Sequence, residues 1–574
     1  MQAMTRRITN CLLLLSVFAG SSSRVQSEDP QAKVPAASPA ESTEESSRAA
    51  AIYPGFAGYA RSVTTRSEDA QRWFNQGIQL LYGYNHDEAI RSFEKAAEID
   101  PSCAMAWWGS AYARGMHINN PEMTEEQSQR AYEASEKAIR ALDGESPVEQ
   151  ALVRAVARRY AWPAPEDRAP LNQAYAAAME KAWHQFPDDA DVGALYAESL
   201  MNLQPWDLWT AAAAPKGRVL EILAVLERTL ARPPRHPGAN HFYIHAIEAS
   251  PWPEKGTEVA ERLGALVPGS GHLVHMPSHI FIRTGRYADA VDSNERAILA
   301  DEAYFKLAPA PDFYSVYYLH NVHFLAYGAM MEGRYKTAID AARKIETQIP
   351  QTFLKKYVTI ADGFMPTALH VLIRFGKWQE ILTEPEPETW RLFSRAEWHF
   401  ARSVAFSSLG NTNAARGELQ SFDAVSNEIT DEWLMGNNKA SDVLRVARSM
   451  AAGELAYREG DHDQAFKLLR QAVALEEGLS YDEPPGWMQP VRHALGALLL
   501  ADGHSVQAED VYRADLRRHP NNAWSLLGLQ QSLGMQGKTA AADALADTVR
   551  KAWARADVKP VASCYCHPDA LLRP

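Results

Sequence analysis

The chain has 574 residues, of which 46% are hydrophobic, 22% charged and 10% aromatic, which is the composition of a folded protein. This length exceeds that of one compact core, so we expect either several domains or an array of repeats. The formal net charge of −13 argues against nucleic acid as the main partner, because phosphate binding needs concentrated Lys and Arg. The same acidic balance favours cationic ligands, metal ions among them.

The first 27 residues have the three parts of an export signal. Arg6 and Arg7 form a basic start, residues 11–20 are apolar, and residues 21–27 are small and polar. We therefore expect a signal peptide over residues 1–27 and a secreted or periplasmic protein. No later stretch reaches the roughly 18 consecutive apolar residues of a membrane helix, so the sequence predicts no membrane span.

Residues 28–50 are rich in Pro, Ser, Ala and Glu and have no apolar period, which predicts a disordered linker. Beyond the linker, small residues recur at a fixed spacing. Alanine lets two crossing helices approach, glycine permits the turn between them, and proline ends the second helix. The first example is formed by Gly77, Ala89, Phe93, Ala96 and Pro101.

This spacing resembles the tetratricopeptide (TPR) repeat, a pair of antiparallel helices of about 34 residues. It predicts an all-α, TPR-like helical-hairpin superhelix (an α-solenoid) and no β-sheet. In such a superhelix the first helix of each pair lines a concave groove. The pattern returns at Gly285, Ala290 and Ala297, at Gly333, Ala338 and Pro350, at Gly460, Ala465 and Ala472, and at Gly496, Ala508 and Pro520.

Two further segments resemble a family of exported bacterial TPR proteins. One is the stretch from Tyr481 to Leu533, which contains Asp-Glu-Pro-Pro-Gly-Trp-Met-Gln-Pro-Val-Arg, and the other is His-Met-Pro-Ser-His-Ile at 275–280. The resemblance covers most of residues 70–555 and implies the fold and export, but no established activity. We divide the chain into a signal peptide (1–27), a linker (28–50), N-terminal helical repeats (51–236), histidine-rich repeats (237–352), C-terminal repeats (353–556) and a tail (557–574).

Two histidine pairs mark the candidate functional site. His241 and His245 are four residues apart, as are His275 and His279, so each pair leaves one side of a helix. The pairs are 34 residues apart, which places them at equivalent positions of successive repeats. Eight of the 18 histidines fall between residues 236 and 323, where an even distribution would put about three.

The same helical stripe carries four further candidate ligands: His272, His320, His323 and Glu248. Packed helices lie about 8–10 Å apart, so imidazoles from adjacent repeats can reach one ion. The residue types suit copper, iron or zinc without ranking them. Glu248 can act as a ligand, as a partner that orients an imidazole, or as a catalytic base on bound water. The alternatives are peptide or ligand contact in the groove and a structural role.

Two weaker groups are noted. His86, Cys103 and His117 surround the first full repeat and suit a copper site, with an inter-helix turn and a buried core cysteine as the structural alternative. Arg492, His493 and His370 are candidates for a groove ligand pocket, with packing as the alternative. Cys564 and Cys566 form a thiol pair in the tail, suited to a metal or a disulfide.

The sequence leaves three functions open. The first is a metal-dependent enzyme, an oxidase or oxygenase or a hydrolase, with Glu248 or Asp292 assisting the metal. The second is a non-catalytic scaffold that holds a peptide, a small molecule or a protein partner in the concave groove. The third is metal handling without turnover. Two or three protein ligands plus a water indicate catalysis, whereas four protein ligands indicate a structural or storage site.

Overall fold

The computed structural model of the protein describes residues 50–308 and 314–568; the expected signal peptide and nearly all of the linker lie outside these ranges. The first half of the described chain contains α1 (Glu68–Tyr82), α2 (His86–Ile99), α3 (Ala104–Ala113), α4 (Glu125–Arg140), α5 (Pro147–Val156), η2 (Ala157–Arg159), α6 (Ala169–Gln185), α7 (Ala190–Met201), α8 (Val219–Ala231), α9 (Pro237–Ile247), η3 (Pro253–Gly256), α10 (Thr257–Leu263), α11 (Gly271–His275), α12 (Pro277–Arg283) and α13 (Tyr287–Leu307).

The second half contains α14 (Tyr314–Glu332), α15 (Tyr335–Gln348), α16 (Gln351–Lys356), α17 (Val358–Ala361), η4 (Asp362–Phe364), α18 (Thr367–Arg374), α19 (Trp378–Thr383), α20 (Leu392–Ser408), α21 (Thr412–Ser426), α22 (Ala440–Arg458), α23 (His462–Glu477), α24 (Val491–Ala501), α25 (Ser505–Arg518), α26 (Ala523–Met535) and α27 (Thr539–Ala552). The predicted all-α superhelix is confirmed. The prediction of no β-sheet is wrong in one small region, because β1 (Leu434–Met435) and β2 (Asn438–Lys439) pair as a two-stranded hairpin.

The TPR resemblance is confirmed by how the hairpins pack. A Cβ atom at Gly77 of α1 would lie 2.7 Å from the ring of Phe93 on α2, and one at Gly109 of α3 would lie 2.4 Å from the same ring. Gly496 and Gly528 enclose Tyr512 of α25 in the same way. Each aromatic ring therefore fills the space that two glycines leave open on the neighbouring first helices, which sets the close approach of successive hairpins.

The turns between paired helices have one residue in the left-handed conformation. In seven hairpins it is a glycine: Gly285, Gly333, Gly376, Gly410, Gly460, Gly503 and Gly537, with φ from 65° to 84°. In the α1–α2 hairpin the equivalent residue is Tyr84, with φ of 56°. A bulky residue with this φ is a strained exception that needs support from its surroundings.

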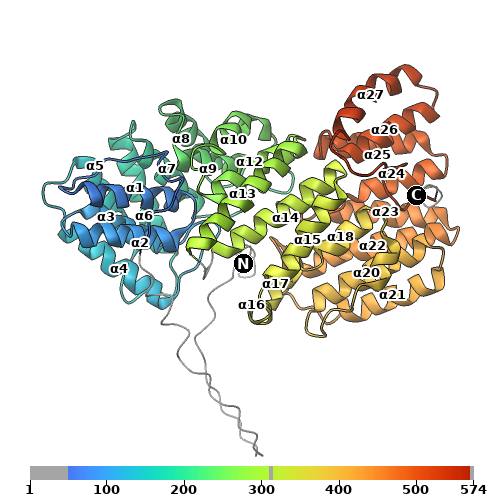
Figure 1. The fold of residues 1–574 in the computed structure, drawn as a ribbon, viewed down its shortest axis with the longest axis horizontal. Coiled ribbons are helices and arrows are strands. Elements are labelled where there is room, and N and C mark those ends of the chain that lie inside the picture. The colour runs from blue at the N-terminus through green and yellow to red at the C-terminus, as the bar shows by residue number, and fades with distance from the viewer. Residues whose placement is uncertain (1–49, 309–313, 569–574) are drawn as a thin grey trace, which may run out of the picture.

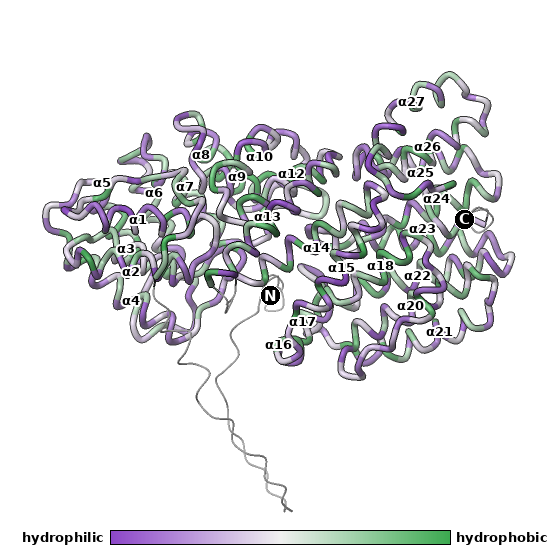
Figure 2. Tube along the Cα trace, in the orientation of Figure 1, coloured by the Kyte–Doolittle hydropathy of each residue, from purple (hydrophilic) through white to green (hydrophobic). Residues whose placement is uncertain are grey.

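The helices form two packed regions that share the centre of the molecule. In Figure 1, α1–α13 lie on one side in blue and green, the yellow-to-red helices lie on the other, and α14 runs between them. One apolar core runs from Tyr53 to Phe375 and the other from Leu369 to Cys566. Figure 2 shows the matching hydropathy, with hydrophobic segments concentrated where helices face each other. Among the described helices, none is both long and apolar enough to cross a lipid bilayer.

The C-terminal repeats fold back onto the middle of the chain. Trp524 Nε1 donates a hydrogen bond of 2.9 Å to the carbonyl of Met330, and Arg555 pairs with Asp292 at 2.7 Å. Asp292 is thus held at the surface by an arginine, away from the imidazoles. The suggestion that Asp292 assists a metal is wrong, because its helix α13 turns that side chain toward the C-terminal repeats instead of the site.

Candidate metal centre

Six imidazoles from neighbouring helices meet in the interior. His241 and His245 project from α9, His272 and His275 from α11, His279 from α12 and His320 from α14. The first five are at most 5% exposed. Pro277 divides the expected single helix into α11 and α12, yet the rings of His275 and His279 still lie 4.8 Å apart.

We define the first imidazole set as His241, His245 and His272, which each offer a nitrogen within 4.8 Å of the other two. His241 Nδ1 donates to the carbonyl of Tyr82 at 2.8 Å, so the unprotonated Nε2 faces His272 Nε2, 3.1 Å away. Within the described parts of the chain, His245 Nε2 has no hydrogen-bond partner, since the proton of its ring points from Nδ1 to Glu248. His241 and His245 therefore each offer an Nε2 lone pair at one place, and the His272 ring completes the set.

The second imidazole set consists of His275, His279 and His320, with the same spacing limit. Asn294 Nδ2 donates to the carbonyl of Ala290, which turns its Oδ1 toward His275 Nδ1 at 2.6 Å. The Nε2 atoms of His275 and His279 lie 2.8 Å apart. Two nitrogens bound to one ion at 2.0–2.1 Å are about 2.9–3.6 Å apart for ordinary coordination angles, so little movement would seat an ion.

Two buried carboxylates contact the imidazole of His279. His279 Nδ1 lies 2.8 Å from Glu248 Oε2 and 2.8 Å from Glu483 Oε2, and these three residues form a third group close enough to hold an ion. Burial alone would lower the pKa of His279, but the two carboxylates outweigh it and raise that pKa to about 10. Burial would raise the pKa of Glu248, but His279 and His245 lower it to about 2. In the absence of a metal, His279 is therefore held as a cation.

The other imidazoles of the two sets are kept neutral. Burial lowers the pKa of His241, His272, His275 and His320 well below the usual value, and neighbouring imidazoles lower it further. Burial also lowers the pKa of His245, although Glu248 opposes the shift. Neutral imidazole is the form that binds a metal.

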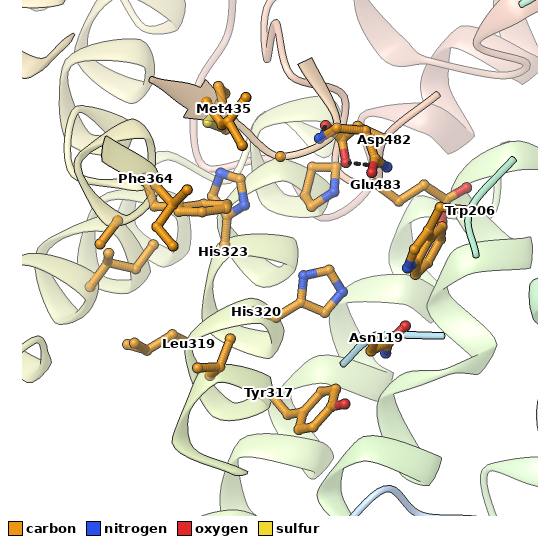
Figure 3. Close-up of a pocket in the computed structure, with 18 of the residues that line it drawn as sticks. Asn119, Trp206, Tyr317, Leu319, His320, His323, Phe364, Met435, Asp482 and Glu483 are labelled. Atoms are coloured by element: carbon orange, nitrogen blue, oxygen red, sulfur yellow. Dashed lines mark hydrogen bonds between the residues drawn. The ribbon is translucent and has the colours of Figure 1, made fainter. Parts of the chain in front are cut away.

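A cavity of about 140 Å³ opens beside both sets. Figure 3 shows Tyr317, His320 and His323 projecting toward it from α14, with Asp482 and Glu483 on the loop that closes its other side. His245, His272 and His279 also line it. Most of the remaining wall is apolar and includes Leu319, Ile345, Ile349, Phe353, Phe364 and Met435.

His323 belongs to neither imidazole set. It lines the cavity further along α14 than Tyr317, its ring makes an edge-to-face contact with Phe364, and neither ring nitrogen has a hydrogen-bond partner among the described residues. Burial lowers its pKa to about 3. One helical turn separates it from His320, which turns it toward α17 and η4 and away from α11. The structure therefore separates His323 from the predicted ligands.

A buried carboxylate fixes the start of α11. Asp301 accepts hydrogen bonds from Tyr314 Oη at 2.9 Å and from Asn321 Nδ2 at 2.8 Å, and burial raises its pKa to about 7. A Cβ at Gly271 would lie 1.9 Å from Asp301 Oδ1. Only glycine therefore fits at the first residue of the helix that presents His272 and His275.

The ring of Tyr84 lies against the first set. Its ring centroid lies 4.2 Å from that of His117, 4.6 Å from His241 and 5.5 Å from His272. In the described chain its buried hydroxyl has no hydrogen-bond partner. The strained backbone of this residue thus brings a phenol ring against the imidazoles, where the other hairpins have only glycine.

The weaker candidates do not form a metal group. The rings of His86 and His117 are 4.5 Å apart, but Cys103 begins α3 as a buried core residue and shares no ligand group with them in the described chain. Burial raises the pKa of the Cys103 thiol to about 11, which keeps it protonated. Cys564 and Cys566 are bonded to each other as a disulfide.

Three residues proposed for a groove pocket lie elsewhere. His493 is buried between Arg374 and Asp515, at 3.0 Å and 2.9 Å, and Arg492 pairs with Glu477 at the surface. His370 packs against Trp487, with ring centroids 5.2 Å apart. None of the three lines the cavity, so packing accounts for each of them.

Sequence reasoning missed the residues that support the two sets. Glu483, Asn294 and Tyr84 are distant in sequence from the histidines they contact. Glu483 lies in a proline-rich loop without periodicity, and Asn294 is one of several polar residues on α13. The only available signal was Tyr84, which stands where the later hairpins have glycine.

Comparisons with known proteins identify no relative. No protein-family model matches the chain, and no curated protein matches it. Among solved structures, human IFIT1 in a dimer with m7Gppp-AAAA is 13% identical, with 85% of this chain and 91% of that chain covered and a TM-score of 0.30. The APC/C hetero-tetramer Cut9–Hcn1 is 12% identical, with 86% and 78% covered and a TM-score of 0.29. Such low scores carry no argument about function, and the assignment of the fold rests on the hairpin packing described above.

Proposed function

We propose that this protein is a metal-dependent oxidase or oxygenase that acts on a small, uncharged and largely apolar molecule. The observation that carries the proposal is the pair of imidazole sets, each of which brings three ring nitrogens within 4.8 Å of one another beside the cavity. The TPR-like superhelix is the frame that brings α9, α11, α12 and α14 together.

A metal explains the imidazoles better than a core does. Burying polar nitrogens without partners costs about 1–3 kcal/mol each, and His245 Nε2 and His272 Nδ1 have no partner among the described residues. Tyr82, Glu248 and Asn294 each occupy the Nδ1 side of a ring, which leaves Nε2 for an ion. An outer partner of this kind is the usual companion of a metal-bound histidine.

The donor atoms and the cavity favour oxidation over hydrolysis. Both sets consist of imidazoles, which suit copper, iron and zinc, and the apolar wall offers little to orient a polar bond for cleavage. Glu248 lies behind the rings, on the Nδ1 side of His245 and His279. This position supports the role of an orienting partner for Glu248 instead of a catalytic base.

The experiment is metal analysis followed by an activity screen of the full chain. We expect copper or iron in the purified protein, and metal-dependent oxygen consumption with uncharged aromatic or aliphatic compounds. His245→Gln should lose the oxygen consumption and part of the bound metal, whereas His504→Gln, at an exposed turn, should lose neither. Protein that neither contains nor binds a metal would leave the non-catalytic scaffold as the function.

Metal handling without turnover is the remaining alternative. Each set supplies three protein ligands, fewer than the four of a closed structural site, so a position stays open toward the cavity. Metal binding without any oxygen consumption across the screen would favour handling over catalysis.

Export is also part of the proposal. The basic start and apolar run of residues 1–27 support a secreted or periplasmic location. Expression of the full chain, followed by N-terminal sequencing of the mature protein, tests it: we expect the mature N-terminus near residue 28.

A further inference from the structure

The two imidazole sets are separate groups that share no residue. Within the first set, the ring of His241 lies 4.8 Å from that of His245 and 4.9 Å from that of His272. Within the second, the ring of His275 lies 4.8 Å from those of both His279 and His320. His241 and His275 are therefore the central members, and they lie on α9 and α11.

The ring distances between the sets resemble those within them, so the separation rests on the ring nitrogens. The centroids of His245 and His279 are 5.7 Å apart and those of His272 and His275 are 6.0 Å apart, whereas within the sets His245 and His272 are 6.4 Å apart and His279 and His320 are 5.7 Å apart. The nitrogens of each set lie within 4.8 Å of one another, and among the described residues no group this close combines members of both sets. Two nitrogens on one ion with metal–nitrogen distances of 2.0–2.1 Å are at most about 4.2 Å apart, so one ion can take the nitrogens of one set but not of both.

We infer that the centre holds two transition-metal ions, one in each imidazole set, side by side at the end of the cavity. This inference rests on the metal binding in the proposed function and deepens it. Each ion has three neutral imidazole ligands and an open position, so a substrate or an oxygen molecule can approach both ions together. Paired metals of this kind act as a clamp on one bound group.

The surrounding charges fit two cations. Two divalent ions bring four positive charges into a buried region, which is costly unless negative charge lies close by. The side chains of Glu248 and Glu483 are both buried and contact Nδ1 of His279 in the second set. Glu248 also contacts Nδ1 of His245 in the first set. Glu248 thus connects the two sets and partly offsets the charge of both ions.

The test is a metal titration of the full-length, metal-depleted protein with Cu(II) and, separately, Zn(II). We expect two equivalents of one of these ions per chain. His245→Gln and His320→Gln each remove one ligand from one set and should each lose one equivalent, and the double variant should lose both. His323→Gln is the matched control, because it lines the same cavity but belongs to neither set, and should keep both equivalents.

A spectroscopic measurement keeps the test valid if a variant folds poorly. In the protein loaded with two Cu(II) ions, coupling between neighbours should broaden or abolish the EPR signal. A half-loaded protein or the His320→Gln variant should give the resolved signal of one isolated Cu(II). A single equivalent in the unaltered protein, or two equivalents with uncoupled signals, would overturn the inference while leaving a one-metal enzyme intact. Failure to bind either ion would overturn the proposed function as well.

Discussion

The Nε2 atoms of His275 and His279 lie 2.8 Å apart, although each ring already has an acceptor at its other nitrogen. Asn294 Oδ1 accepts the hydrogen bond of His275 Nδ1–H, and the carboxylates of Glu248 and Glu483 face His279 Nδ1. In metal-free protein the positive charge of His279 can supply a proton between the two nitrogens. In the proposed metal-bound state an ion would take the place of that proton.

Asn294 provides the first test of this arrangement. Asn294→Ala removes the acceptor that fixes the His275 ring, and we expect metal affinity at the second set to fall about 10–100-fold. Asn294→Asp keeps an oxygen acceptor and should retain most of the affinity. The dissociation constant of the metal is measured for each variant by competition with a chelator. Equal losses of affinity in the two variants would show that the oxygen acceptor at position 294 does not determine the affinity.

Gly271 should be irreplaceable at the start of α11. In Gly271→Ala the new methyl group collides with the buried carboxylate of Asp301, so we expect the free energy of unfolding to fall by about 1–3 kcal/mol. Gly417→Ala is the control, since the space around that helical glycine is open, and it should be neutral or slightly stabilising. Urea unfolding of both variants gives their free energies of unfolding. An unchanged free energy in Gly271→Ala would contradict the close contact between Gly271 and Asp301.

Tyr84→Phe tests whether the buried hydroxyl of Tyr84 contributes to the stability of the metal-free protein. The Tyr84 hydroxyl has no hydrogen-bond partner in the described chain, so its removal should leave stability unchanged or raise it by about 1 kcal/mol. Tyr112→Phe is the contrast, because the Tyr112 hydroxyl donates to the buried Glu198 and its loss should be destabilising. Thermal unfolding without metal measures both, and a clear loss of stability in Tyr84→Phe would reveal a missing partner.

Glu454 should make the protein less stable as the pH rises. Burial raises the folded-state pKa of Glu454 to about 7, although Arg458 opposes the shift. A raised pKa stabilises the fold fully below the unfolded value near 4.5, and this contribution is lost as the pH rises to about 7. Glu454→Gln does not titrate, so it should match the unaltered protein at pH 4 and exceed its stability by roughly 3 kcal/mol at pH 8.

The control for Glu454 is an exposed glutamate with no such burial, such as Glu68. Glu68→Gln makes the same substitution at the surface and controls for the loss of one carboxylate. Denaturant unfolding at pH 4, 6 and 8 gives the curves, and a constant difference between Glu454→Gln and the unaltered protein across this range would refute the expected titration.

The sequence predicted the histidines of the site whose positions follow the 34-residue repeat. The 34-residue offset between His241 and His275 placed them on successive first helices, and the structure brings these helices together around the two sets. Helical periodicity also put His320 and His323 on one helix, but it could not tell which of them faces α11. That choice depends on how α14 is rotated against its neighbours, which is a property of tertiary packing.

The supporting residues could not be predicted because no periodic signal links them to the histidines. Glu483 reaches His279 from a loop between α23 and α24, and Asn294 faces His275 only because α13 packs against α11. The concave groove expected from the repeats is narrowed to a cavity here, with Asp482 and Glu483 of this loop in its wall. Such contacts between distant repeats depend on the curvature of the whole superhelix.

The late position of Glu483 bears on how the protein is assembled. The six imidazoles lie between 163 and 242 residues before this glutamate in the sequence, and repeat arrays fold from local contacts. A chain that has folded only as far as α14 lacks the loop of Asp482 and Glu483, which lines the cavity in the complete fold. On the proposed function this loop covers the ions, and we expect them to exchange slowly in the folded protein.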